Sequence, residues 1–247
     1  MQPEEAAQRA LQPIEPQRQK LSDLAVERLV ELLMSRDMKP GDALPSEADL
    51  ARAFGVSKPV VREAMHRLVS MGVLNIRQGK PANVRAINSE PLALFFRFAM
   101  RASPRGLREA VELRRMLETE IAGQAARHIT DEQLAELKTV IDEMRASGDD
   151  AERWVAADLR FHQLLAQASG NSLVLFLIEA LKATMEETIR IMHAQRPLRD
   201  QRATLRRHVA IQDAVVARDP EAARAAMDAH FAATETVVSA VIAARSS

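Results

Sequence analysis

The stretch that decides the fold is LPSEADLARAFGVSKPVVREAMHRLVSMGVLNIRQGKPANV, residues 44–84. Ser46 and Asp49, three residues apart, form a helix-capping pair. Gly55 then ends that short helix, and Ser57 can cap the next one. After Gly72 the residues read as two short strands around the turn QGKP. With the amphipathic segment that precedes residue 44, the order helix, turn, helix and hairpin predicts a winged helix-turn-helix over residues 18–87.

The last helix of this unit should present a basic face to solvent. Its apolar residues recur three and four apart and face inward, which leaves Lys58, Arg62 and His66 one turn apart on the outside. An arginine or lysine in such a helix can enter the major groove and bond guanine. Gly79 and Lys80, at the tip of the hairpin, can follow the DNA backbone or the minor groove. The simpler alternative is a solvated basic surface, but the ordered series of cap, turn, helix and hairpin favours DNA binding.

Overall composition excludes few functions, because 34 basic side chains balance 34 acidic ones. The distribution is uneven: residues 18–87 carry twelve Lys and Arg against eight Asp and Glu, so the front of the chain is basic. The chain has no cysteine, no apolar leader and no apolar run near the ~18 residues of a membrane span. These features predict a cytoplasmic protein with no disulfide framework and no membrane partner.

Residues 44–84 resemble the DNA-binding domain of the GntR family of bacterial transcription regulators. The resemblance rests on L-P-S-E, V-S, V-R-E-A, R-L and the Q-G-K of the hairpin. It implies operator contacts from the helix near Ser57 to Arg62 and from the wing near Gly79 and Lys80. The full set of expected DNA-binding residues is Ser46, Ser57, Lys58, Arg62, Gly79 and Lys80. A single winged helix offers a small base-reading surface, so we expect a homodimer on double-stranded operator DNA with an inverted repeat.

Beyond the break NSEP, residues 88–91, the chain has only helical patterns. Amphipathic segments follow one another at roughly 92–101, 104–128, 131–146, 151–168, 172–194, 199–217 and 221–244. The sequence therefore predicts a mainly α protein in four parts. These are a disordered arm at 1–17, the winged helix at 18–87, a linker at 88–91 and an all-α domain of about seven helices at 92–247.

Four polar residues of the predicted all-α domain fall on apolar helix faces. Asp158 and His162 are four apart in DLRFHQLLAQASGN, residues 158–171. His208 and His230 lie on the apolar stripes of the last two helices. Each histidine taken alone is more simply a hydrogen-bonded core residue. Taken together, three imidazoles and a carboxylate in one bundle suit a divalent metal ion, with zinc first and nickel or manganese as alternatives.

A second resemblance concerns this domain. Residues 110–126, 158–171 and 206–231 (AVELRRMLETEIAGQAA, DLRFHQLLAQASGN and RRHVAIQDAVVARDPEAARAAMDAHF) resemble the FCD effector domain of the FadR subgroup of the GntR family. In many members of that subgroup an aspartate and three histidines hold a metal ion. The resemblance implies this role for Asp158, His162, His208 and His230, in a helical domain that binds an effector and dimerises.

Arg114 lies on the apolar face of its predicted helix, where an unpaired charge is costly. Glu118, four residues later, can neutralise it as an internal ion pair. The alternative partner is an anionic ligand, because a guanidinium binds a carboxylate through two parallel hydrogen bonds. The resemblance favours the ligand, since Arg114 matches the family pattern E-x-R-x-x-L-E, and we expect a small carboxylate effector. Asn171 matches the family's G-N and either lines the same cavity or caps the next helix.

Two classes of function fit these residues. The first is a ligand-responsive repressor whose front domain binds DNA and whose back domain binds a metal ion and a small carboxylate. The second is a metal-dependent hydrolase with an appended winged helix, in which the ion activates water. None of the six histidines is followed by aspartate, and no further carboxylate beside the ligands stands out as a general base. The sequence therefore favours the regulator and predicts no enzymatic activity.

Overall fold

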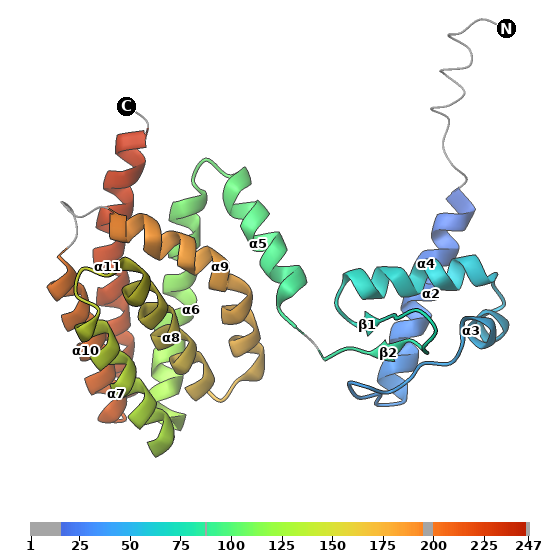
Figure 1. Cartoon of the computed structure of the whole chain (residues 1–247), viewed down its shortest axis with the longest axis horizontal. Coiled ribbons are helices and arrows are strands. Elements are labelled where there is room, and N and C mark those ends of the chain that lie inside the picture. Colours follow the sequence, from blue (N-terminus) through green and yellow to red (C-terminus); the bar gives the residue numbers. More distant parts are fainter. Residues whose placement is uncertain (1–15, 87, 195–199, 246–247) are drawn as a thin grey trace, which may run out of the picture. The chain divides into compact units, whose positions relative to one another are not determined.

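The computed structural model describes residues 16–86, 88–194 and 200–245, and the chain divides into two compact units at residues 91 and 92 (Figure 1). The predicted disordered arm lies outside the described residues, except that residues 16 and 17 already belong to the first helix. Proline, which lacks a backbone N–H, fits this position because the N–H groups in the first turn of a helix have no hydrogen-bond partner within the helix. None of the described helices combines the length and the apolar composition that a membrane span requires.

The first unit is a winged helix-turn-helix, as the sequence predicts. Its elements are α2 (Pro16–Ser35), α3 (Glu47–Phe54), α4 (Lys58–Ser70), β1 (Leu74–Asn75) and β2 (Asn83–Val84). The strands are antiparallel and pair Leu74 with Val84 on either side of the QGKP turn. Helices α2 and α3 both pack on α4. The inward face of α4 is buried at Val61, Met65 and Leu68, which confirms the predicted apolar stripe.

The ends of α3 follow from local chemistry. The Ser46 hydroxyl accepts a hydrogen bond from the Asp49 N–H at 3.2 Å and donates one to the Asp49 carboxylate at 2.6 Å. Gly55 ends the helix with a φ of 67°, a left-handed conformation that glycine adopts without strain. Ser57 occupies the N-cap position of α4, but its side chain makes no capping hydrogen bond, contrary to the expected role of that hydroxyl.

The second unit consists entirely of helices in its described residues. These are α5 (Glu90–Ala102), α6 (Gly106–His128), α7 (Asp131–Ala146), α8 (Ala151–Ala168), α9 (Ser172–Ala194), α10 (Gln201–Val216) and α11 (Pro220–Arg245). The number agrees with the predicted seven. Helix α5 starts at Glu90, so the last two residues of the predicted linker 88–91 are helical instead. Pro91 explains the difference, because proline is tolerated in the first turn of a helix.

Helix α6 is the centre of this bundle and packs against α8, α9, α10 and α11, while α7 covers α8 and α10. The side chains of Thr130, Asp150 and Asp200 cap α7, α8 and α10, which sets the points where these helices begin. The core contains the fully buried Trp154 and Phe161, and the rings of His162 and His208 lie beside them.

Candidate functional site

Three histidines from three helices meet in the core of the second unit. His162 from α8, His208 from α10 and His230 from α11 each offer one ring nitrogen, and these nitrogens lie within 4.8 Å of one another. All three side chains are buried. Within the described residues, no hydrogen bond satisfies either ring nitrogen of His162, Nε2 of His208 or Nδ1 of His230. Because buried polar atoms are normally paired, this convergence has the chemistry of a metal-ligand set.

Asp158 lies one helical turn before His162 and faces the same cluster. Its Oδ1 is 3.2 Å from His162 Nε2 and 3.7 Å from His208 Nε2. The indole Nε1 of Trp154 donates a hydrogen bond to the other carboxylate oxygen, Oδ2, at 3.2 Å. The structure therefore brings together all four residues that the sequence singled out as metal ligands. It adds Trp154 as a residue that orients the carboxylate.

The tautomer of His208 follows from its surroundings. Its Nδ1 lies 2.9 Å from the carbonyl oxygen of Thr204. A carbonyl oxygen only accepts hydrogen bonds, so Nδ1 carries a proton, and Nε2 is the ring nitrogen that faces the cluster. A hydrogen bond from the other ring nitrogen to a backbone carbonyl is the usual way in which a protein orients an imidazole to bind a metal ion.

Arg114 and Glu118 form an ion pair beside the histidines. The guanidinium Nε donates to Glu118 Oε1 at 2.7 Å, and the two residues are only 3% and 2% exposed. The other carboxylate oxygen, Oε2, lies against His162 Nδ1 with the proximity of an ion pair but without hydrogen-bond geometry. The internal pair that the sequence allowed for Arg114 therefore exists. It also links the arginine to one of the clustered histidines.

These contacts shift the protonation equilibria of the cluster. Burial by itself raises the pKa of the Glu118 carboxyl, but the charges of Arg114 and His162 outweigh burial and hold that pKa at about 2. For His162, burial lowers the pKa, while the charge of Glu118 and the contact with Asp158 raise it to about 9. Burial and the neighbouring His208 keep the pKa of His230 well below its ordinary value. These contacts therefore favour a proton on His162, and a bound cation would compete with that proton.

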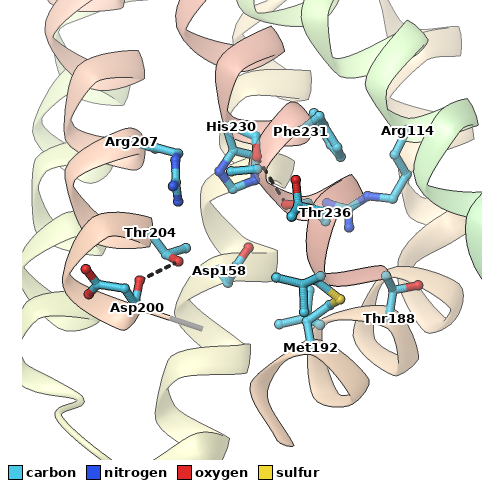
Figure 2. A pocket seen from close by; sticks show the side chains of 14 residues that line it. Arg114, Asp158, Thr188, Met192, Asp200, Thr204, Arg207, His230, Phe231 and Thr236 are labelled. Atoms are coloured by element: carbon cyan, nitrogen blue, oxygen red, sulfur yellow. Dashed lines mark hydrogen bonds between the residues drawn. The ribbon is translucent and has the colours of Figure 1, made fainter. Parts of the chain in front are cut away.

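A cavity of about 310 Å³ adjoins the cluster. Figure 2 shows Arg114 and Arg207 on opposite sides of this cavity, with Asp158 and His230 between them. The guanidinium carbon of Arg114 lies 5.2 Å from the centre of the Phe231 ring. Pockets for small molecules usually measure ~300–1,000 Å³. The cavity is therefore large enough for a small organic molecule that reaches both the histidine cluster and Arg114.

Asn171 does not line this cavity, so the expectation that it contacts an effector there is corrected. Its Oδ1 accepts hydrogen bonds from the N–H groups of Leu173 and Val174, at 3.0 and 3.3 Å. It lines a separate cavity of about 410 Å³ between α6 and α9. Of the two roles that the sequence left open, the structure places Asn171 in the helix cap, because the unpaired N–H groups at a helix start attract a side-chain oxygen.

The first unit carries the predicted DNA-binding residues on its surface. Lys58 and Arg62 are exposed along α4. The Arg62 guanidinium is held by Glu47 of α3, with Nη2 2.7 Å from one carboxylate oxygen and Nε 3.1 Å from both. Sequence reasoning missed Glu47, because fifteen residues separate the pair and only the fold of α3 on α4 brings them together. An arginine held in this way must exchange Glu47 for a base or reach the base while still bound to it.

The wing and the two serines are also accessible. Gly79 has a φ of 73°, which favours glycine, and a side chain added there would meet open space. Lys80 beside it is exposed. The Ser57 hydroxyl makes no capping bond, and so can turn toward a phosphate, whereas the Ser46 hydroxyl is occupied by the cap of α3.

Comparison with known proteins gives a consistent result over both units. Residues 21–84 match the family described as bacterial regulatory proteins, gntR family, and residues 109–233 match the FCD domain. The HTH-type transcriptional repressor NanR of Cronobacter sakazakii is 31% identical over 219 residues, which cover 87% of this chain and 84% of that protein. The repressor of the same name from Salmonella schwarzengrund is 31% identical over 224 residues, with coverages of 87% and 82%. The solved structure of Streptococcus agalactiae GntR matches with a TM-score of 0.63 and 25% sequence identity. The match covers 87% of this chain and 99% of the Streptococcus agalactiae chain.

Proposed function

The chain belongs to the GntR family of bacterial regulatory proteins, with an FCD domain behind its winged helix-turn-helix, and from this premise we propose a metal-dependent repressor that responds to a small carboxylate. Family membership makes the protein a DNA-binding transcription regulator and not an enzyme. The alternative of a metal-dependent hydrolase is therefore not supported.

The observation that carries the proposal is the convergence of buried, unpaired histidine nitrogens beside a cavity that contains an arginine. Three imidazoles and one carboxylate are ligand types that zinc prefers, and nickel or manganese are the alternatives. Asp158, His162, His208 and His230 would hold the ion. A bound divalent ion supplies a positive charge that an oxygen atom of a ligand can contact.

Arg114 supports an anionic ligand in spite of its ion pair. Glu118 takes the guanidinium Nε, and among the described residues no other hydrogen bond of this guanidinium is found. Its terminal amino groups therefore remain for a molecule in the cavity that Arg114 lines. A carboxylate between the ion and Arg114 would meet positive charge on both sides. This arrangement makes a small carboxylate the best candidate for the effector.

For DNA, we infer that a homodimer places two winged helices on an inverted repeat. The contacts would come from Ser46, Ser57, Lys58, Arg62, Gly79 and Lys80. The effector can change operator affinity only if it binds unequally to the DNA-bound and the free form. A coupling of roughly 1–3 kcal/mol corresponds to a 5- to 150-fold change in operator affinity.

Metal analysis of the purified protein, combined with native mass spectrometry, tests the first part of this proposal. We expect one divalent ion per chain in a dimer, and His208→Ala should lose most of it because that imidazole is a buried member of the cluster. His128→Ala, at the exposed end of α6, is the matched control and should keep the ion. Full retention of the metal by His208→Ala would contradict the proposed metal site.

Calorimetry with a panel of small acids tests the second part. Any acid that binds should require both the metal ion and Arg114, because both positive charges would contact its carboxylate. Equal binding to native protein, chelated protein and Arg114→Ala would show that the acid binds elsewhere.

A further inference from the structure

We propose that Glu47 is a positioning residue for DNA recognition, which holds the Arg62 guanidinium in the orientation that reads guanine. The inference rests on the proposed function, because it takes Arg62 as a side chain that reaches a base. Glu47 is the first residue of α3, and Arg62 lies near the start of α4. Their side chains are 31% and 57% exposed, so the pair joins the two helices at a surface that DNA can reach.

The hydrogen bonds of this pair leave one side of the guanidinium free. Nε of Arg62 donates to both carboxylate oxygens of Glu47 at 3.1 Å, and Nη2 donates to Oε2 at 2.7 Å. A guanidinium has five N–H groups, and this contact uses the one on Nε and one of the two on Nη2. One N–H of Nη2 and one of Nη1 then remain as a parallel pair at the end of the side chain. Such a pair matches the O6 and N7 acceptors of guanine, so Arg62 can read the base while Glu47 still holds it.

The same contact makes other uses of Arg62 less favourable. An arginine side chain has many rotamers, and ordering it on binding weakens association. Because Glu47 orders the guanidinium before DNA arrives, the guanine contact avoids this cost. A phosphate or a base that requires another orientation of Arg62 must first break the ion pair. Glu47 therefore increases the difference in affinity between guanine and the other bases at this position.

The charge of Glu47 acts in the same direction. Its hydrogen bonds from Arg62, together with the charges of Arg62, His66 and Lys58, outweigh partial burial and lower the pKa of its carboxyl. Glu47 therefore remains an anion at neutral pH, among the basic side chains that should face DNA. An anion at this position repels phosphates and weakens binding to DNA of any sequence. The gain in specificity is thus accompanied by a lower affinity for random DNA.

Affinity measurements with the full chain test the inference by fluorescence anisotropy. The probes are the tightest duplex that the native protein selects from a random-sequence library, the same duplex with each guanine replaced in turn, and a random duplex. The guanine read by Arg62 is the one whose replacement has no further effect on Arg62→Ala. In the native protein this replacement should weaken binding by roughly 5- to 150-fold, the usual effect of one mismatched base pair.

Glu47→Gln keeps the size of the side chain and removes its charge. This variant should discriminate against the replaced guanine about 3-fold less than the native protein or weaker still, because Arg62 is no longer ordered in advance. It should also bind the random duplex more tightly. The released Arg62 can then contact a phosphate, so the slope of log affinity against log salt on that duplex should steepen by about one unit.

Glu31→Gln is the matched control, because it removes the same charge from another surface pair of the first unit. Glu31 accepts a hydrogen bond from Arg28 Nη1 at 2.7 Å on α2, and both side chains are exposed. Arg28 is not among the expected DNA-binding residues. This variant should therefore keep the native discrimination at the guanine read by Arg62.

A double-mutant cycle shows whether Glu47 acts through Arg62. In the Arg62→Ala background no guanidinium remains to be oriented, so adding Glu47→Gln should leave the base preference unchanged. A change in preference as large as in the native background would show that Glu47 contacts a base itself, and would overturn the positioning role. Native discrimination in Glu47→Gln would overturn it as well.

The behaviour of Arg62→Ala separates these failures from a failure of the proposed function. If Arg62→Ala loses its preference for one guanine, base reading by Arg62 stands and only the role of Glu47 is wrong. If Arg62→Ala keeps every base preference of the native protein, base reading by Arg62 is wrong and the positioning role falls with it.

Discussion

Glu118→Gln should destabilise the folded protein, because it breaks the buried ion pair between Arg114 and Glu118. The substitution keeps the size of the side chain but removes its charge. Arg114, only 3% exposed, then remains as a buried cation without its counter-charge. Breaking one side of a buried ion pair typically costs about 3–5 kcal/mol. For a chain of this length, each kcal/mol lowers the melting temperature by about 2–4 °C, so the total decrease should be roughly 6–20 °C.

The same variant should weaken metal binding, because Glu118 Oε2 lies against the ring of His162. Loss of a partner that orients a metal-ligating histidine typically lowers metal affinity by about 10- to 100-fold. Calorimetric unfolding of the chelated protein measures the first effect, and competition with a chromogenic chelator measures the second.

Glu120→Gln is the matched control for both measurements. Glu120 lies two residues further along α6 and pairs with Arg224, but its side chain is 56% exposed. A surface pair of this kind contributes about 0–1 kcal/mol, so this variant should unfold near the native temperature and keep its metal affinity. If Glu118→Gln loses no more stability than Glu120→Gln, the ion pair is not the buried requirement that its geometry indicates.

Three further predictions concern the DNA-binding surface and the metal ligands. Arg62→Ala should cost on the order of 1–3 kcal/mol on operator DNA and relax the preference at one base pair, whereas equal loss on random DNA would argue against base reading. Lys80→Ala should weaken binding evenly across sequences and lower the slope of log affinity against log salt by about one unit, and an unchanged slope would remove it from the phosphate contacts. Trp154→Phe keeps an aromatic ring but loses the N–H that orients Asp158. Competition with a chelator should therefore show a metal affinity about 10- to 100-fold lower, and an unaltered affinity would contradict this role.

The fold was predictable where local chemistry decides it. The helix boundaries of α7, α8 and α9 agree with the sequence periodicity, because a side-chain oxygen at Thr130, Asp150 or Asn171 caps each start. Two errors, at α2 and α5, fall where proline stands in a first turn, because proline allows a helix to begin although it often marks a break. A third is the start of α6, which lies at Gly106 and not at the predicted residue 104.

The candidate site was predictable only in part, for a reason of geometry. Helical spacing places Asp158, His162, His208 and His230 on apolar faces, and polar residues on such faces are conspicuous. Arg207 and Thr204 carry no comparable signal in the sequence, because they become part of a cavity only when α9 and α11 pack nearby. The contact of Glu118 with His162 likewise needs the packing of α6 on α8, which no pattern within one helix reveals.

The position of the cavity limits how the proposed effector can act on DNA. Every residue that lines it belongs to the second unit, between residues 114 and 237. The lining comes from α6, α8, α9, α10 and α11 and from Asp200, which caps α10, so a molecule bound there would contact five helices. The ion pair of Arg114 with Glu118, and the contact of Glu118 with His162, would join the proposed ligand position to the proposed metal position. By linkage, a ligand that strengthens metal binding must itself bind more tightly in the presence of the metal ion. An effect on operator affinity then requires that the arrangement of these helices differ between the DNA-bound and the free protein, because equal affinity for both forms would change nothing.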